Sequence, residues 1–129
     1  MNEGIKIKYR INRSCFIGCS EICNNKEDLN EIIKQYKKKY RDAKQICYAI
    51  ISEGIEIYND DKEPNGTAGA MILKELKKNN IKNILIIIVR YFGGIKLGKN
   101  NLKNTYAEIA SKIIDSINSN IKNNNENNK

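Results

Sequence analysis

The sequence predicts an α+β domain, built as a two-layer α/β sandwich in which helices cover a mixed sheet. Apolar and charged residues alternate with period two in some segments, as in half-buried strands, whereas other segments carry apolar residues at helical spacing. In the second half of the chain a strand, a helix and another strand follow one another. This last pattern favours a crossover between parallel neighbours, and we therefore expect the sheet to be mixed.

The first elements are expected to be a hairpin and a helix. Residues 5–11 alternate as IKIKYRI, and residues 14–22 continue across the turn Asn12-Arg13, which predicts two antiparallel strands. Residues 26–40 carry apolar side chains at i, i+3, i+4, i+7 and i+11, with Asn25 placed to cap the first turn. They predict an amphipathic helix with a basic outer face.

The remaining elements alternate strand and helix around an acidic loop. Residues 46–52 and 55–58 predict a buried strand and a short partner, and residues 68–78 predict a second helix that leads into a strand over residues 83–91. Apolar spacing from Leu102 to Ile117 predicts a third helix. We expect one domain over residues 1–118 and a disordered Asn-rich tail over residues 119–129, which is too polar to bury a surface of its own.

Composition restricts the class of protein. The 129 residues carry 23 basic and 15 acidic side chains, a net charge of +8 that favours nucleic acid or acidic surfaces as partners. The longest apolar run, ILIIIV, is far shorter than the roughly 20 residues of a membrane span, and residues 1–11 do not resemble a signal peptide. We expect a cytoplasmic protein without a membrane partner, and we favour a monomer.

The absence of histidine excludes a His general base, a Ser-His or Cys-His nucleophile pair and a His-ligated metal. The four cysteines, Cys15, Cys19, Cys23 and Cys47, have a C-x3-C-x3-C spacing that matches neither zinc knuckles nor a redox C-x-x-C, and we expect reduced, buried thiols. The carboxylates of residues 60–63 could hold Mg²⁺, but turn chemistry also explains them. We expect no cofactor and no metal.

The first functional motif is DDKEPNGTAG, from Asp60 to Gly69. Thr67 stands where a helix cap would, so backbone N–H groups at the start of the second helix could bind an anion, although an ordinary cap is the alternative. The residues predicted for an anion or ligand site are Glu63, Gly66, Thr67, Ala68, Gly69 and Arg90.

The second functional motif is RYFGGIKLG, from Arg90 to Gly98. Basic residues without an intervening acid are interleaved there with aromatics, a composition that suits a surface tracking phosphates and stacking bases, with a solvated charged face as the alternative. The residues predicted for nucleic-acid or partner binding are Arg90, Tyr91, Phe92, Gly93, Gly94, Lys96, Lys99 and Lys103.

The two motifs together resemble the hallmark of the Impact family, of the YigZ and Impact N-terminal domain type. The matching residues are Asp61, Glu63, Pro64, Gly66, Thr67, Ala68, Gly69, Arg90, Tyr91, Phe92, Gly93, Gly94, Leu97 and Gly98. Three sites depart from the family pattern: Gln45 stands where the family usually has His, Asn100-Asn101 replace a Gly pair, and Asn104 replaces an Arg. The resemblance implies the fold of the second domain of ribosomal small-subunit protein five.

The resemblance also implies a function. Eukaryotic Impact relatives restrain the stress kinase that phosphorylates initiation factor two alpha, so a non-enzymatic regulatory domain in translation, acting through a protein or ribosome-associated partner, is expected. An RNA-binding module that uses residues 90–103 is the alternative. A hydrolase-type enzyme on a phosphorylated or peptide substrate would use Glu63 as base, Thr67 as anion binder and Arg90 as charge stabiliser, but the lack of histidine counts against it.

Overall fold

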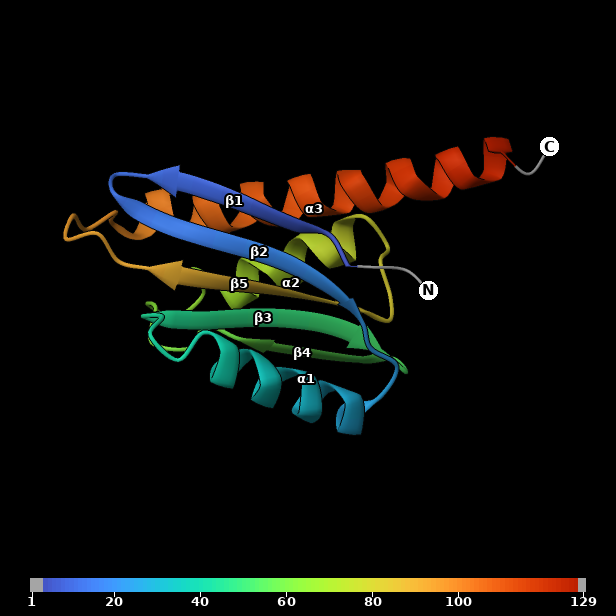
Figure 1. Cartoon of the computed structure of the whole chain (residues 1–129), viewed down its shortest axis with the longest axis horizontal. Helices are drawn as coiled ribbons and strands as arrows, with labels where there is room; N and C mark the ends of the chain where they lie inside the picture. The colour runs from blue at the N-terminus through green and yellow to red at the C-terminus, as the bar shows by residue number, and fades with distance from the viewer. Residues whose placement is uncertain (1–3, 128–129) are drawn as a thin grey trace.

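The computed structural model describes residues 4–127, and the side chains of residues 4–121. The elements in chain order are β1 (Lys6–Ile11), β2 (Ser14–Ile22), α1 (Lys26–Lys39), β3 (Gln45–Ser52), β4 (Ile55–Asn59), α2 (Gly69–Lys78), β5 (Ile84–Tyr91) and α3 (Lys99–Asn127) (Figure 1). The predicted strands and helices are present, and apart from the end of α3 their ends shift by three residues or fewer. None of the described helices is both long and apolar enough to cross a membrane.

The strands form one sheet in the order β1-β2-β5-β3-β4, and every pair of neighbours is antiparallel. The α+β class is confirmed, but the prediction of a mixed sheet is wrong. The crossover through α2 joins β4 to β5, and β3 lies between these two strands. The two strands run in the same direction but do not pair. The prediction failed because the sequence pattern indicates the direction of the strand after a crossover but not which strand lies between.

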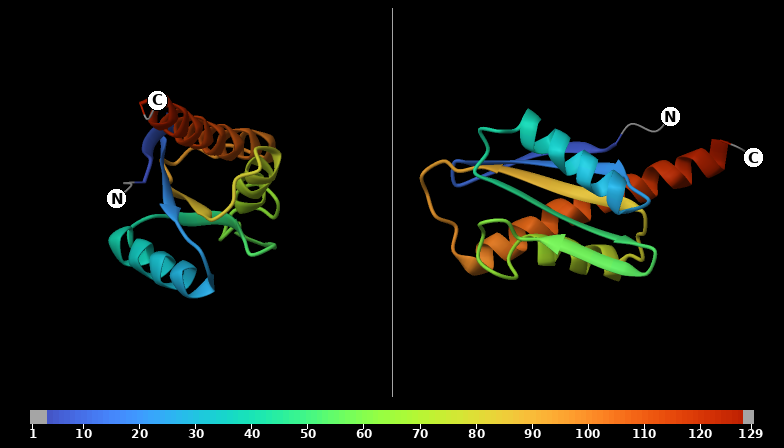
Figure 2. Two further views of the ribbon diagram at one scale, coloured as in Figure 1. Left: turned by 90° about the vertical axis from the view of Figure 1, so that its right-hand side faces the viewer. Right: turned by 90° about the horizontal axis from the view of Figure 1, so that it is seen from below.

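Helices lie on both faces of the sheet, so the fold has a third layer that the predicted two-layer sandwich lacks (Figure 2). On one face, α1 packs through Leu29 and Ile33 in a cluster with Leu85, Ile87 and Val89 of β5. On the other face, α2 and α3 pack in a cluster with Ile86 and Ile88. The central strand β5 is therefore apolar at successive positions, as strands buried on both faces usually are.

Local signals explain most element boundaries. Asn12 and Arg13 both have positive φ, 47° and 67°, as a two-residue hairpin turn of type I′ requires. Asn25 caps α1 as predicted, since its side-chain oxygen accepts from the backbone N–H of Asp28 at 2.9 Å. The predicted cap of α2 is wrong: Ala68 is the N-cap residue, and the Thr67 hydroxyl donates to the carbonyl of Pro64 at 2.6 Å instead.

The last helix is longer than its apolar spacing predicts. It continues to Asn127, through most of the segment that composition predicts to be a disordered tail, and residues 128–129 lie outside the described residues. Its last turns project beyond the sheet (Figure 1). Once a helix is nucleated against the core, each added residue contributes a further hydrogen bond, which composition alone does not anticipate.

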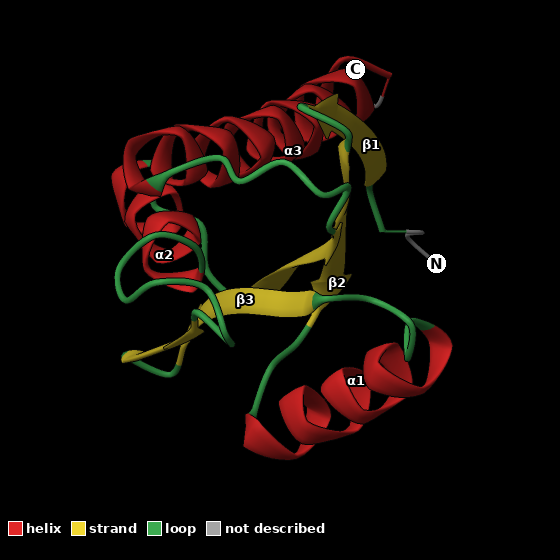
Figure 3. Ribbon diagram, turned by 90° about the vertical axis from the view of Figure 1, so that its left-hand side faces the viewer, coloured by secondary structure: helices red, strands yellow, loops and turns green. Residues whose placement is uncertain are grey.

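One end of the sheet gathers the functional motifs. The strands β4 and β5 end there, while β3, α2 and α3 begin there, and Figure 3 looks onto the loops that join them. Both motifs from the sequence lie in these loops and in the adjoining ends of β5 and α2. The fold thus brings residues 60–69 and residues 90–99 together at a single end of the molecule.

Candidate functional site

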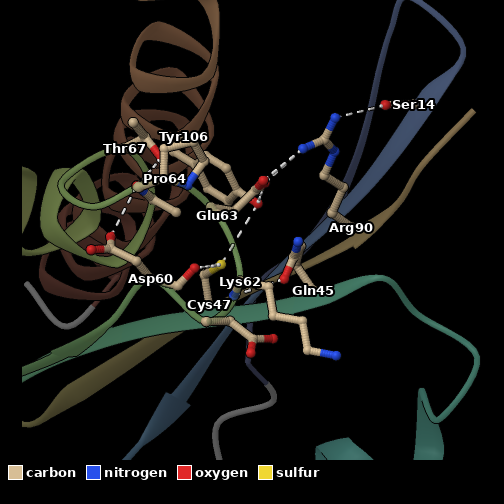
Figure 4. Close-up of polar contacts among 12 residues, drawn as sticks. Ser14, Gln45, Cys47, Asp60, Lys62, Glu63, Pro64, Thr67, Arg90 and Tyr106 are labelled. Atoms are coloured by element: carbon tan, nitrogen blue, oxygen red, sulfur yellow. Dashed lines mark hydrogen bonds and ion pairs between the residues drawn. The ribbon is translucent and has the colours of Figure 1, made fainter. Parts of the chain in front are cut away.

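A buried ion pair joins the two motifs. Nη1 of Arg90, near the end of β5, donates to both carboxylate oxygens of Glu63 at 2.8 Å (Figure 4). The hydroxyl of Tyr106 on α3 donates to the same carboxylate at 2.6 Å. The side chains of Arg90 and Glu63 are only 6% and 4% exposed. The acidic loop, β5 and α3 are therefore held to one another by charge-assisted hydrogen bonds inside the protein.

The guanidinium of Arg90 also has aromatic neighbours. Its central carbon lies 5.5 Å from the ring centroids of both Phe16 and Phe92, close enough for cation–π attraction. Nη2 approaches the hydroxyl of Ser14 at 3.4 Å, and Nε has no hydrogen-bond partner among the described residues. The guanidinium of Arg90 is thus held in place by a carboxylate, a hydroxyl and two aromatic rings.

A thiol and a phenol extend the buried network. Sγ of Cys47 lies 3.7 Å from the hydroxyl of Tyr106 and donates to the carbonyl of Asp60 at 3.3 Å. Burial raises the pKa of the Cys47 thiol and of the Tyr106 phenol, and the nearby charge of Glu63 raises both further. Both groups stay protonated at neutral pH and serve as donors in this network.

The start of α2 is occupied by the chain itself. Oδ1 of Asp60 accepts from the N–H groups of Ala68 and Ala70 at 3.1 Å, and Oδ2 accepts from that of Gly66 at 2.9 Å. Gly69 packs against the backbone of Asn59, where a Cβ would lie 2.3 Å from a carbonyl oxygen. The carboxylate of Asp60 therefore lies where the sequence predicts an external anion.

The other two acidic side chains of this loop are engaged elsewhere. Asp61 accepts from the N–H of Ile46 at 2.8 Å, and Glu63 faces Arg90. Within the described part of the chain, no group of three or more cysteine or acidic side chains is arranged to hold a metal ion. The three carboxylates instead shape the loop.

Next to the ion pair lies a pocket of about 340 Å³, which we call the basic pocket. Its lining combines polar groups at Gln45, Glu63 and Arg90, apolar groups at Pro64, Phe92, Leu97 and Leu102, the lysines Lys44, Lys96 and Lys99, and Gly98. Because Glu63 and Arg90 neutralise each other, the lysines leave an excess of positive charge around the opening. Such a mixture of apolar walls with a few polar groups is typical of ligand sites.

Gln45 presents an unused donor to the basic pocket. Its side-chain oxygen accepts from the N–H of Lys62 at 2.9 Å, and the residue is only 4% exposed. Figure 4 shows its amide nitrogen on the side of Glu63 and Arg90, and the described residues provide no acceptor for it. The position that departs from the family pattern thus faces the site.

The start of α3 borders the basic pocket through Gly98 and Lys99. The first backbone hydrogen bond of this helix runs from the N–H of Leu102 to the carbonyl of Gly98 at 3.0 Å. The preceding N–H groups, of residues 99–101, have no acceptor among the described residues. These donors carry the positive end of the helix dipole.

The structure brings together only some of the predicted site residues. The basic pocket is lined by Glu63, Arg90, Phe92, Lys96 and Lys99. Tyr91 instead packs against the apolar cluster between α1 and the sheet, and Lys103 does not line the pocket. Gly93 packs on the backbone of Arg13, and Gly94 has φ 93°, so both glycines shape the loop.

Sequence reasoning missed six residues of this pocket as site residues: Lys44, Gln45, Pro64, Leu97, Gly98 and Leu102. Pro64, Leu97 and Gly98 belong to the two motifs, which is a signal that could have found them. The other three carry no local signal, because only the folded arrangement of β3 and α3 brings them beside the motifs.

Comparisons with known proteins agree with this architecture. The chain matches the family model of the Impact N-terminal domain over residues 12–114. It is 36% identical over 110 residues to the IMPACT family member YvyE of Bacillus subtilis, covering 83% of this chain and 51% of that protein. An IMPACT family member of Haemophilus influenzae is 30% identical over 125 residues, covering 93% of this chain and 61% of that protein.

A solved structure supports the fold. The crystal structure of a hypothetical protein matches with a TM-score of 0.83 and 26% identity, over 87% of this chain and 57% of the other. The chain therefore spans between half and about three fifths of the length of these relatives.

Proposed function

This chain belongs to the Impact family, and on that premise we propose that it is a non-enzymatic binding domain that acts in translation or its stress regulation through a protein or ribosome-associated partner. The resemblance drawn from the two motifs is thereby confirmed, whereas the role in translation is what that resemblance implies. Because the chain spans only part of its relatives, the activity of the whole proteins is part of the proposal.

The observation that carries the proposal is the basic pocket, which three lysines line. Lys44, Lys96 and Lys99 surround an opening with apolar walls, while the neighbouring acidic side chains of the loop are engaged inside the chain. A surface of this kind attracts an acidic partner and offers it an apolar contact. Its location on loops held by a rigid sheet is typical of binding sites.

The same geometry argues against the hydrolase interpretation. Glu63, the candidate base, accepts hydrogen bonds from Arg90 and Tyr106 and is buried. Glu63 lines the basic pocket, but its carboxylate is already engaged by these two donors, and the Thr67 hydroxyl is buried and bonded to a carbonyl. A catalytic base must reach the proton that it removes, and here the buried pair with Arg90 stands in the way.

An RNA-binding module is the second candidate. Lys96 and Lys99 line the same pocket as Phe92, which is 42% exposed and could stack on a base. This arrangement favours single-stranded RNA, because lysines can follow the phosphates while the ring accepts any base. An RNA partner and a protein partner would use the same lysines but would differ in their dependence on salt.

Association with purified ribosomal subunits and with a labelled single-stranded RNA tests both candidates. We expect the chain to sediment with ribosomal subunits and the variant Lys96→Glu with Lys99→Glu to remain in the supernatant. The matched control is Lys26→Glu with Lys82→Glu, which makes the same charge change at exposed residues near the opposite end of the sheet.

Fluorescence anisotropy at several salt concentrations then separates the candidates. Binding to RNA alone with a log-log salt slope of about −0.7 per phosphate contact, lost in the first variant, would favour the RNA module. Binding to ribosomal subunits with negligible affinity for free RNA at physiological salt would favour a protein partner. A role for this surface would be refuted if both charge variants lost binding equally, or if neither variant lost binding.

A further inference from the structure

We infer that the basic pocket binds a nucleoside 5′-phosphate, with the phosphate at the start of α3 and the base against Phe92. The inference rests on the proposed binding role of this end of the sheet and names the chemistry of the ligand. A free mononucleotide and the 5′ end of an RNA strand carry the same group, so both are sources of this ligand.

The start of α3 provides the phosphate site. Asp60 and Asn25 supply acceptors to the starts of α2 and α1, whereas the described residues provide no acceptor for the N–H groups of residues 99–101. Lys96 and Lys99 border the same opening. Free N–H groups at a helix start together with lysines bind phosphate through both hydrogen bonds and charge.

The chain itself shows which group such a helix start takes. At α2 the N–H groups receive a carboxylate, that of Asp60, at 2.9 to 3.1 Å. Gly98 has φ 75°, and no atom lies within 4 Å of the position of a Cβ, so the backbone before α3 is open on that side. An external anion can therefore approach the α3 start without displacing a side chain at Gly98.

Gln45 is an independent indication of a ligand. The residue is 4% exposed, its side-chain oxygen accepts from the N–H of Lys62, and it lines the basic pocket. Its amide nitrogen has no acceptor among the described residues and, unlike Nε of Arg90, is not fully buried, so it is open to the pocket and free to donate to a ligand there. Nucleobases present carbonyl and ring-nitrogen acceptors at their edges, which suit this amide.

The apolar wall and the size of the pocket suit a planar base. Phe92 is exposed at 42%, and Leu97 and Leu102 line the same space. The volume of about 340 Å³ lies at the small end of the range for ligand pockets, which excludes large cofactors and accommodates a mononucleotide. Inorganic phosphate alone would leave Gln45 and the apolar wall without a partner.

A titration followed by ¹H–¹⁵N NMR on the full chain tests the inference directly. With adenosine 5′-monophosphate we expect shifts of the backbone amides of residues 99–101 and of the side-chain amide of Gln45. Adenosine or inorganic phosphate, added alone, should bind at least about tenfold more weakly. No shift at these groups with millimolar nucleotide, or equal affinity for phosphate alone, would overturn the inference.

Substitutions separate the contacts. Gln45→Glu keeps the acceptor for Lys62 but removes the donor, and should weaken nucleotide binding about tenfold or more. Because a new buried charge could disturb the fold, Phe92→Leu is the second variant: it keeps an apolar side chain, loses the stacking surface and should also weaken binding. Unchanged affinity in a folded Phe92→Leu variant would overturn the placement of the base.

Two comparisons distinguish the source of the nucleotide, and distinguish a failure of the nucleotide site from a failure of the proposed function. Tighter binding of a 5′-phosphorylated RNA than of its 5′-hydroxyl counterpart identifies an RNA end, whereas equal weak binding of both RNAs, with tight binding of the mononucleotide, identifies a free nucleotide. If the chain sediments with ribosomal subunits but does not bind the nucleotide, only the nucleotide site is refuted and the proposed function stands.

Discussion

Removing the carboxylate of the buried ion pair should strongly destabilise the fold. In Glu63→Ala, Arg90 keeps its charge at a position where its side chain is 6% exposed, and Tyr106 loses its acceptor. Breaking a buried pair from one side costs about 3–5 kcal/mol. A domain of this size unfolds at a cost of about 5–15 kcal/mol, so the loss is a large fraction of the total. With about 4 °C per kcal/mol, Tm should fall by roughly 12–20 °C.

Two further variants show that the cost arises from the unpaired charge. Tyr106→Phe removes a single hydrogen bond to a charged acceptor, which costs about 1.5–3 kcal/mol, and the variant should be less affected than Glu63→Ala. Glu63→Leu with Arg90→Met replaces both charges by apolar groups, and removal of both partners is often close to neutral. The double variant should therefore be more stable than Glu63→Ala.

Urea unfolding followed by circular dichroism measures these differences, provided that the m-value is unchanged. The reasoning would be refuted if Glu63→Ala lost less than about 1 kcal/mol, since such a loss is typical of an exposed pair. It would also be refuted if the double variant were no more stable than Glu63→Ala.

Three further predictions concern the parts of the fold that support the site. Asp60→Ala removes the acceptor for several N–H groups at the start of α2 and should cost about 1–3 kcal/mol in urea unfolding, whereas a change below about 0.5 kcal/mol would show that water replaces it. Gly93→Ala would place a Cβ 1.9 Å from the carbonyl oxygen of Arg13, so Tm should fall by several degrees, and an unchanged Tm would show that the loop moves freely. Iodoacetamide at neutral pH should modify half-buried Cys15 well before Cys47, because burial raises the pKa of the Cys47 thiol, and mass spectrometry showing the opposite order would contradict the buried network.

Local patterns predicted the elements well because their causes are local. The alternation of residues 5–11, the cap at Asn25 and the turn at Asn12-Arg13 act within a few residues, and each is confirmed. The order of the strands was not predictable in this way. A crossover from β4 to β5 has the same sequence pattern whether the two strands pair or enclose β3, and only long-range packing decides between these arrangements.

The site was predictable only in part for a related reason. The motifs indicated Glu63 and Arg90, but not that the two side chains satisfy each other across 27 residues of sequence. The glycines and Thr67 suggested an open helix start at α2. The acceptor that closes it, Asp60, lies eight residues before Ala68, beyond the reach of capping rules that count three or four residues.

Some residues of the two motifs therefore hold the loops in place, whereas others remain available on the surface. Buried Glu63 and Arg90 and half-buried Asp60 make hydrogen bonds that fix the loops, and these bonds leave the acidic side chains little capacity to meet a partner. The side chains that remain available, at Lys96, Lys99 and Gln45, lie in the spacer positions of the second motif or outside both motifs. Membership of the Impact family consequently accounts for the shape of the pocket and for its apolar wall at Phe92 and Leu97 more directly than for the polar contacts of a ligand, which the motifs do not specify.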